Sequence, residues 1–129
     1  MSDRYRELHD LSVAFLDAFN RNDLDAVMSY FREDAVYEEL TGRVSQGVAA
    51  IRTAFAPQFE GKFGPIQFIE DDTFIDAGSG KIMSSWDMTI DKDGTPQLMR
   101  GLDLLHFVGD KIVRKQTYVK TKSPHYTAR

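Results

Sequence analysis

The chain has 129 residues, of which 42% are hydrophobic and 28% are charged, the usual balance for one globular domain. Its net charge of -4 argues against binding to nucleic acid or to an anionic membrane surface, because both need a basic patch. The absence of cysteine excludes disulfides, thiolate metal sites and cysteine nucleophiles. The first ten residues are polar and no apolar run approaches about 20 residues, so we expect a single cytoplasmic domain over residues 1–129.

Helical spacing dominates the first third of the chain. The first predicted helix has an apolar stripe with members every three or four residues: Leu8, Leu11, Phe15, Ala18 and Phe19. A second helix is predicted to begin after an N-cap at Asp23 and to turn four side chains inward: Leu24, Val27, Met28 and Phe31. A third is predicted to begin near Gly47 and to end or kink at Pro57.

The remaining segments alternate as strands do and are separated by turn residues such as Asp93-Gly94. The predicted strands are Ala35–Leu40, Ile66–Ala77, Lys81–Ile90, Leu98–Val108 and Ile112–Lys120. Short turns between the last four make them an antiparallel meander. The order indicates an α+β fold, in which three helices cover one face of a curved sheet and enclose a space.

One predicted strand is apolar on both faces. One side carries Leu98, Leu102, Leu104 and Val108, and the other carries Met99, Leu105 and Phe107. Because an antiparallel strand that faces water is polar on one side, both faces of this strand should be covered. The helices can cover only one, so we predict a homodimer through the outer sheet face, with a cover made by the C-terminal tail as the alternative.

Asp103 is out of place in this strand, between Leu102 and Leu104. A buried carboxylate is costly unless it is paired or protonated, and burial favours the neutral form. Asp103 could therefore donate a proton to a developing oxyanion or, when ionised, accept one. The alternative is an ion pair with Arg114 or another base across the sheet.

Glu39 is a second candidate acid. Alternation sends Glu38 and Glu39 to opposite faces at the end of a predicted strand, and Glu39 is the one that faces inward with Tyr37. Two carboxyl groups in one pocket, Glu39 and Asp103, could act as an acid and a base. The alternative is that both glutamates are solvated.

The remaining candidate residues indicate a pocket wall, and they give no sign of a metal or cofactor site. Trp86 and Met88 lie on the more apolar face of their strand and either belong to the core or line the pocket. No pair of histidines has metal-ligand spacing, and no phosphate-binding glycine loop is present. We therefore expect neither a metal nor a cofactor.

Several motifs resemble the nuclear transport factor 2-like superfamily, and within it the SnoaL-like polyketide cyclase group. The similar segments are residues 19–27, 31–37, 47–51, 100–107 and 109–113, together with Gly42. The resemblance covers nearly the whole chain. It implies a cone-shaped barrel, a curved sheet wrapped round a long helix, which is usually dimeric.

The resemblance also implies roles for individual residues. Asp103 falls on the oxyanion-donor Asp of ketosteroid isomerases, and a cyclase acid/base Asp lies in the matching strand. The isomerase base falls on Glu39, whereas the isomerase oxyanion Tyr falls on Phe15, which has no hydroxyl group.

Two hypotheses about function follow. The first is a cofactor-independent isomerase or aldol-type cyclase that moves a proton next to a carbonyl on a small apolar ring substrate. Asp103 and Glu39 would then be catalytic in a pocket lined by Phe15, Tyr37, Trp86, Met88 and Phe107. The second is a non-catalytic module of the same fold that binds a small apolar organic ligand or another protein.

Overall fold

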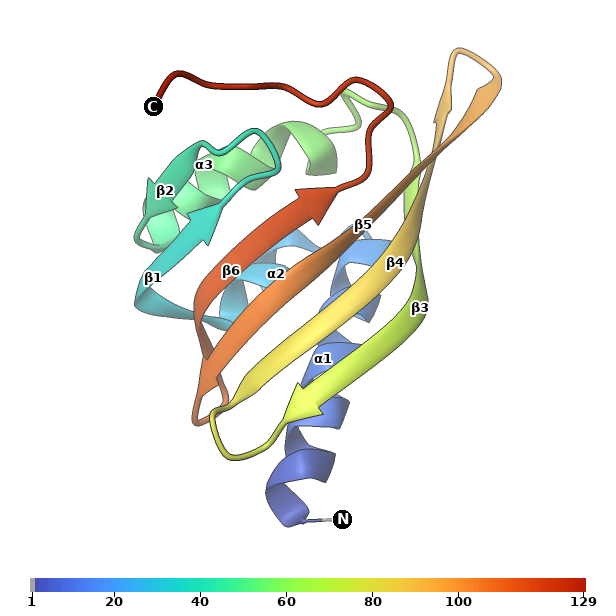
Figure 1. Cartoon of the computed structure of the whole chain (residues 1–129). Helices are drawn as coiled ribbons and strands as arrows, with labels where there is room; N and C mark the ends of the chain where they lie inside the picture. Colours follow the sequence, from blue (N-terminus) through green and yellow to red (C-terminus); the bar gives the residue numbers. More distant parts are fainter. Residues whose placement is uncertain (1) are drawn as a thin grey trace.

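The computed structural model describes residues 2–129, in which three helices are combined with six strands (Figure 1). The helices are α1 (Asp3–Asn20), α2 (Leu24–Ser29) and α3 (Val48–Phe59). The strands are β1 (Phe31–Glu38), β2 (Val44–Gln46), β3 (Ile66–Asp76), β4 (Lys81–Lys92), β5 (Thr95–Val108) and β6 (Lys111–Val119). None of these helices is long and apolar enough to cross a membrane.

The six strands form one curved sheet in the order β2-β1-β6-β5-β4-β3. All neighbours are antiparallel except β1 and β6, which run parallel because β1 reaches the sheet from the helical part of the chain. The sheet is open, with β2 and β3 at its edges, and its inner face wraps around α1 (Figure 1). The predicted α+β class and mainly antiparallel sheet are confirmed.

The apolar stripe predicted for the first helix packs against this inner face. Ser2 caps the helix, with its Oγ accepting a hydrogen bond from the backbone N–H of Tyr5 at 3.1 Å. The stripe is buried along its length: Leu8, Phe15, Ala18 and Phe19. The core therefore lies between α1 and the sheet, and α3 closes it on the side of β1 and β2 (Figure 1).

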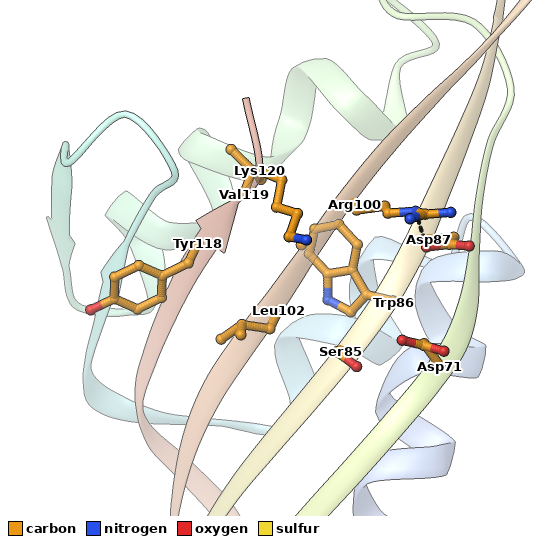
Figure 2. A pocket seen from close by; sticks show the side chains of 10 residues that line it. Asp71, Ser85, Trp86, Asp87, Arg100, Leu102, Tyr118, Val119 and Lys120 are labelled. Atoms are coloured by element: carbon orange, nitrogen blue, oxygen red, sulfur yellow. Dashed lines mark ion pairs between the residues drawn. The ribbon is translucent and has the colours of Figure 1, made fainter. Parts of the chain in front are cut away.

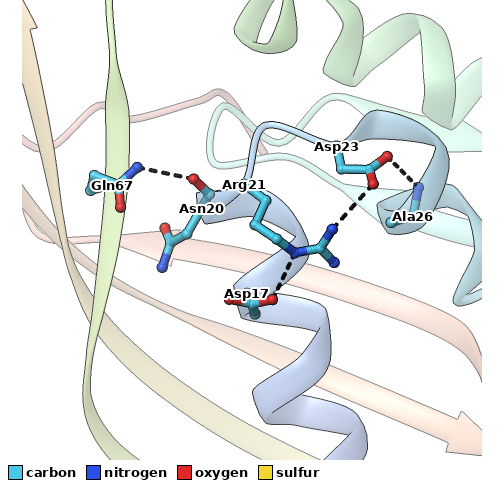
Figure 3. Close-up of polar contacts among 6 residues, drawn as sticks. All are labelled: Asp17, Asn20, Arg21, Asp23, Ala26 and Gln67. Atoms are coloured by element: carbon cyan, nitrogen blue, oxygen red, sulfur yellow. Dashed lines mark hydrogen bonds and ion pairs between the residues drawn. The ribbon is translucent and has the colours of Figure 1, made fainter.

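The junction between α1 and α2 is held by polar contacts (Figure 3). Asp23 accepts a hydrogen bond from the backbone N–H of Ala26 at 3.0 Å, which confirms it as the N-cap of α2. Arg21 joins the two helices, because its guanidinium donates to Asp17 at 2.7 Å and to Asp23 at 3.2 Å.

The end of α1 is also tied to β3. The side-chain amide of Asn20 donates to the carbonyl of Phe68 at 2.8 Å and accepts from the N–H of Phe68 at 2.7 Å. Gln67 donates in turn to the carbonyl of Asn20 at 3.1 Å (Figure 3). Because Phe68 faces the core, this contact sets the spacing between α1 and an edge strand.

Two local expectations are corrected, and one strand was missed. Phe31 is buried, but it begins β1 rather than completing α2, which ends at Ser29. Pro57 lies inside α3, which continues to Phe59, so the helix does not end at Pro57. The edge strand β2 is too short, at three residues, to be found from alternation.

The outer sheet face carries exposed apolar side chains on three strands: Phe74, Leu98, Leu104, Val108 and Tyr118. The C-terminal tail, residues 120–129, is exposed and crosses towards α3, away from this face (Figure 1). The C-terminal tail therefore does not cover the outer sheet face. We still predict that a second copy of the chain covers it.

We expect the protein to be a homodimer in light scattering at micromolar concentration, and Leu104→Lys to convert it to a monomer. A lysine at the centre of an apolar interface would bury an unpaired charge. Val13→Lys, a change at an exposed apolar residue of α1, is the matched control and should leave the mass unchanged. A monomeric wild-type protein would contradict the prediction.

Candidate functional site

An inner cavity of about 80 Å³ lies between α1, α3 and the inner face of the sheet. Its aromatic wall consists of Phe15, Phe19, Tyr37, Phe55, Phe68 and Trp86. Its other apolar residues are Leu16, Leu40, Met88 and Met99. Its polar residues are Gln58, Asp103, Lys115 and Thr117.

Asp103 lies in this cavity and is only 8% exposed, but it is not a lone acid. Its Oδ1 accepts hydrogen bonds from Lys115 Nζ at 2.9 Å and from Thr117 Oγ1 at 2.6 Å. Its Oδ2 accepts one from Trp86 Nε1 at 3.1 Å. Three donors fit an ionised carboxylate, which can only accept. The expectation of an unpaired or proton-donating Asp103 is therefore corrected.

The alternative of an ion pair with Arg114 or another base across the sheet is confirmed for another base, Lys115. Arg114 itself faces outward and lies near Glu38 at 3.8 Å. Phe107 pairs with Ile112 whereas His106 pairs with Arg114, so Val113 is an extra residue in β6. This bulge shifts the alternation by one, which turns Lys115 inward beside Asp103.

Lys115 is buried against aromatic rings as well as against its carboxylate. Its Nζ lies 4.5 Å from the ring centroid of Tyr37, 5.6 Å from that of Phe55 and 5.9 Å from that of Phe19. Burial, the largest single influence, would by itself lower the pKa of Lys115. The charge and hydrogen bond of Asp103, together with Tyr37 and Glu39, outweigh burial and raise the pKa above its ordinary value of 10.5. The ammonium group is therefore charged at neutral pH.

Tyr37 completes the wall around this charge. Its ring stacks on Phe55 with centroids 4.7 Å apart and an interplanar angle of 24°. Burial raises the pKa of Tyr37, which the nearby Lys115 only partly offsets. Its hydroxyl group is therefore neutral, and Tyr37 lines the cavity as expected.

Glu39 lies next to this cavity rather than in it. It lines an outer vestibule of about 610 Å³, formed by residues of the 37–46 segment, by α3 and by Phe63. Its Oε2 is buried without a hydrogen-bond partner, because the nearest cation, Arg43 Nε, is 4.0 Å away. The expectation that Glu39 and Asp103 share one pocket is therefore corrected.

The inner cavity and the outer vestibule adjoin. Both are lined by Tyr37, Leu40, Phe55 and Gln58. The negative charge of Glu39 also contributes to the raised pKa of Lys115, so the two spaces are coupled electrostatically. A ligand that spans the junction could meet a cation on one side and a carboxylate on the other.

The remaining predicted residues divide between the cavity and the core. Phe15, Trp86 and Met88 line the inner cavity as expected. Phe107 is buried in the core and is not among the lining residues. Within residues 2–129, no group of three or more acidic or histidine side chains could hold a metal ion.

Arg100 faces away from Asp103, as regular alternation predicts. The pairing of β4 with β5 has no bulge at Gly101, and Arg100 forms a 3.5 Å ion pair with Asp87. Figure 2 shows this pair at a cleft of about 400 Å³ on the outer sheet face, with Tyr118 on the opposite side. This cleft shares only Trp86 with the lining of the inner cavity.

Gly101 is required by the ring of Trp86. A Cβ atom at residue 101 would lie 2.5 Å from Trp86 Cη2 and 2.6 Å from the carbonyl oxygen of Tyr118. The indole also packs edge-to-face on Phe68 at 5.0 Å, so it cannot move inward freely. Gly101 therefore lets the indole N–H reach Asp103.

The comparisons with known proteins agree with this fold. Residues 13–115 match the family model of the SnoaL-like domain. No curated protein sequence matches the chain.

Solved structures with similar folds include three of bacterial origin. A protein named as a polyketide cyclase from Xanthomonas campestris is 19% identical, with a TM-score of 0.76 over 90% of this chain and 92% of that one. An NTF2-like protein of unknown function from Mesorhizobium loti is 20% identical, with a TM-score of 0.77 over 94% and 97%. A protein with a ketosteroid isomerase-like fold from Catenulispora acidiphila, in complex with trimethylamine, is 17% identical, with a TM-score of 0.73 over 84% and 83%.

We expect Lys115→Met to lower the free energy of unfolding by about 3–5 kcal/mol, because it leaves the buried Asp103 carboxylate without its counter-charge. Chemical denaturation measures this loss. Arg114→Met is the matched control on the same strand and should stay within about 0.5 kcal/mol of wild type, since Arg114 is exposed. Equal losses in the two variants would contradict the assignment of Lys115.

The same pair predicts a pH dependence. Because folding raises the pKa of Lys115, its stabilising contribution is complete below 10.5 and is lost as the pH rises through the folded-state value. The difference in stability between wild type and Lys115→Met should therefore shrink above this pH.

We expect Gly101→Ala to destabilise the protein by about 1–3 kcal/mol, as overpacking does. The emission of Trp86, the single tryptophan of the chain, should shift as its ring moves. Gly78→Ala is the control, because a Cβ there meets nothing closer than 3.9 Å. An unchanged stability and spectrum would show that the ring does not depend on Gly101.

Proposed function

Because the chain belongs to the SnoaL-like domain family, we propose that it is a cofactor-independent enzyme of the isomerase or aldol-type cyclase kind. It moves a proton at a carbon next to a carbonyl group on a small apolar ring substrate. The observation that carries this proposal is the buried ammonium group of Lys115, which lines an otherwise apolar, aromatic cavity.

Lys115 is suited to stabilise an enolate. Two of its donor directions are used by Asp103 and Thr117, at 2.9 and 2.8 Å, and the ammonium group has three. A carbonyl oxygen placed against the third would gain more from this charge as it becomes an enolate oxygen, because the cavity excludes water. Tyr37, with its neutral hydroxyl, supports the same oxygen.

Glu39 is suited to be the base. Its Oε2 has no hydrogen-bond partner, so a lone pair is free to take a proton, and the vestibule that it lines adjoins the cavity of Lys115. The proton passes from the carbon to Glu39, and the electron pair of the C–H bond forms the enolate. An isomerase returns the proton to a different carbon. In a cyclase the enolate carbon attacks a second carbonyl group, whose π electrons move to its oxygen, and that oxygen takes the proton from Glu39.

Asp103 takes a different part from the one that its sequence position suggested. Its two oxygens accept bonds from Lys115, Thr117 and Trp86, so it holds the ammonium group in place and does not exchange a proton itself. In this proposal Asp103 is a positioning residue and Lys115 is the residue that touches the substrate. This arrangement needs no metal or cofactor, because the enolate is stabilised by the protein's own charge.

A specific observation also favours the second candidate, a non-catalytic ligand-binding module of the same fold. Three donors occupy three of the roughly four lone-pair sites of the carboxylate inside the cavity, so most of its capacity to accept a proton is already used. In that case Lys115 would bind the acceptor oxygen of a small apolar ligand without turnover. The two candidates differ only in whether Glu39 removes a proton.

We expect the wild-type protein to exchange the α-protons of 4-methylcyclohexanone in D2O, followed by proton NMR. Glu39→Gln should slow this exchange by about 100-fold to 10,000-fold, the usual contribution of a general base. Glu38→Gln is the matched control, because Glu38 faces outward beside Gln116 and Arg114. Binding without exchange in wild type would favour the ligand-binding module, and equal rates in wild type and Glu39→Gln would remove Glu39 as the base.

A further inference from the structure

The inner cavity is small for a substrate. Its volume of about 80 Å³ is well below the roughly 300–1,000 Å³ of ligand pockets, whereas the outer vestibule, at about 610 Å³, falls within that range. The proposed base, Glu39, lines the vestibule, and the proposed cation, Lys115, lines the inner cavity. A substrate that meets both must extend through the junction.

The wall at the junction is continuous. Tyr37, Leu40, Phe55 and Gln58 line both spaces, so they form a shared and mainly apolar boundary between the two. Apart from the hydroxyl group of Tyr37, Gln58 on α3 supplies the polar side chain of this shared lining. The molecule at the junction is therefore expected to be largely apolar.

The vestibule presents exposed apolar side chains from two separate segments. Leu40 is 48% exposed, Val44 59% and Phe63 49%, and all three line this one space. Single exposed apolar residues are common, but a group around the mouth of a cavity indicates a surface that an apolar ligand covers. The buried, unpartnered Oε2 of Glu39 lies in the same space, which points to a ligand there.

We propose that the substrate has two parts: a compact carbonyl-bearing head that enters the inner cavity, and an apolar body that stays in the outer vestibule. This inference rests on the proposed function, because the head is placed by Lys115 and Glu39. Leu40, Val44 and Phe63 then determine specificity by covering the body, with no part in the chemistry. Substrates are selected by the length of their apolar body as well as by their carbonyl group.

The test compares two ketones with the same head, 4-methylcyclohexanone and 4-pentylcyclohexanone. The indole N–H signal of Trp86, the only tryptophan, reports binding in the inner cavity by NMR and yields a dissociation constant for each probe. Burial of a methylene group is worth about threefold to fourfold in affinity. Four added methylenes, partly covered, should therefore tighten binding to wild type by at least about tenfold.

The double variant Val44→Ser/Phe63→Ser removes two of the three exposed apolar side chains of the vestibule and changes no residue that lines the inner cavity. We expect it to lose most of the gain from the longer chain and to bind 4-methylcyclohexanone within about twofold of wild type. Phe74→Ser is the control, because Phe74 is also exposed, at 69%, but lies on the outer sheet face, and it should keep the full gain. Because all three residues are exposed, the variants should fold, which denaturation checks.

The outcomes separate this inference from the proposed function. If 4-methylcyclohexanone binds and exchanges its protons while the pentyl compound binds no more tightly, the two-part substrate is wrong and the proposed function stands. If the double variant keeps the gain from the longer chain, the vestibule does not hold the body and the inference fails. If neither ketone shifts the Trp86 signal, both fail together.

Discussion

The ion pair between Asp103 and Lys115 is the interaction on which the interior of this protein depends. Removing two charges from water costs several kcal/mol for each, and the mutual attraction repays this only when the remaining hydrogen-bonding groups are also satisfied. Here Thr117 and Trp86 supply the further donors, and the rings of Tyr37 and Phe55 face the ammonium group. These hydrogen bonds fix the position of the Asp103 carboxylate. They use two of the three N–H donors of Lys115 and leave the third without a hydrogen bond.

The supports of the pair come from distant parts of the chain. The β-bulge at Val113 turns Lys115 inward, and the missing side chain at Gly101 lets the indole of Trp86 reach the carboxylate. The contact of Asn20 with Phe68 sets the distance between α1 and β3, so that α1 closes the cavity. Packing and electrostatics are therefore coupled in this interior, because a shift of the surrounding strands or of α1 also shifts the Asp103–Lys115 pair.

The division between the inner cavity and the outer vestibule follows from the same architecture. The sheet curves around α1, and α3 covers only the part formed by β1 and β2. The end of β1 therefore lies at the boundary, where Tyr37 lines both spaces and Glu39 lines only the vestibule. A cation deep in an apolar cavity and an acid at its entrance form a polar axis, which suits a ligand that is polar at one end and apolar along its length.

The sequence by itself determined the fold class, because periodicity is local: the stripe of α1, the cap at Asp23 and the Asp93-Gly94 turn each depend on neighbouring residues. It also identified Asp103 as a buried acid. Only the tertiary structure decided what Asp103 does, because its partner, Lys115, is brought inward by a bulge that breaks the alternation. Only the tertiary structure shows that Glu39 and Asp103 line different spaces. The inner cavity and the outer vestibule are both bounded by α3, so their division depends on how α3 packs against β1.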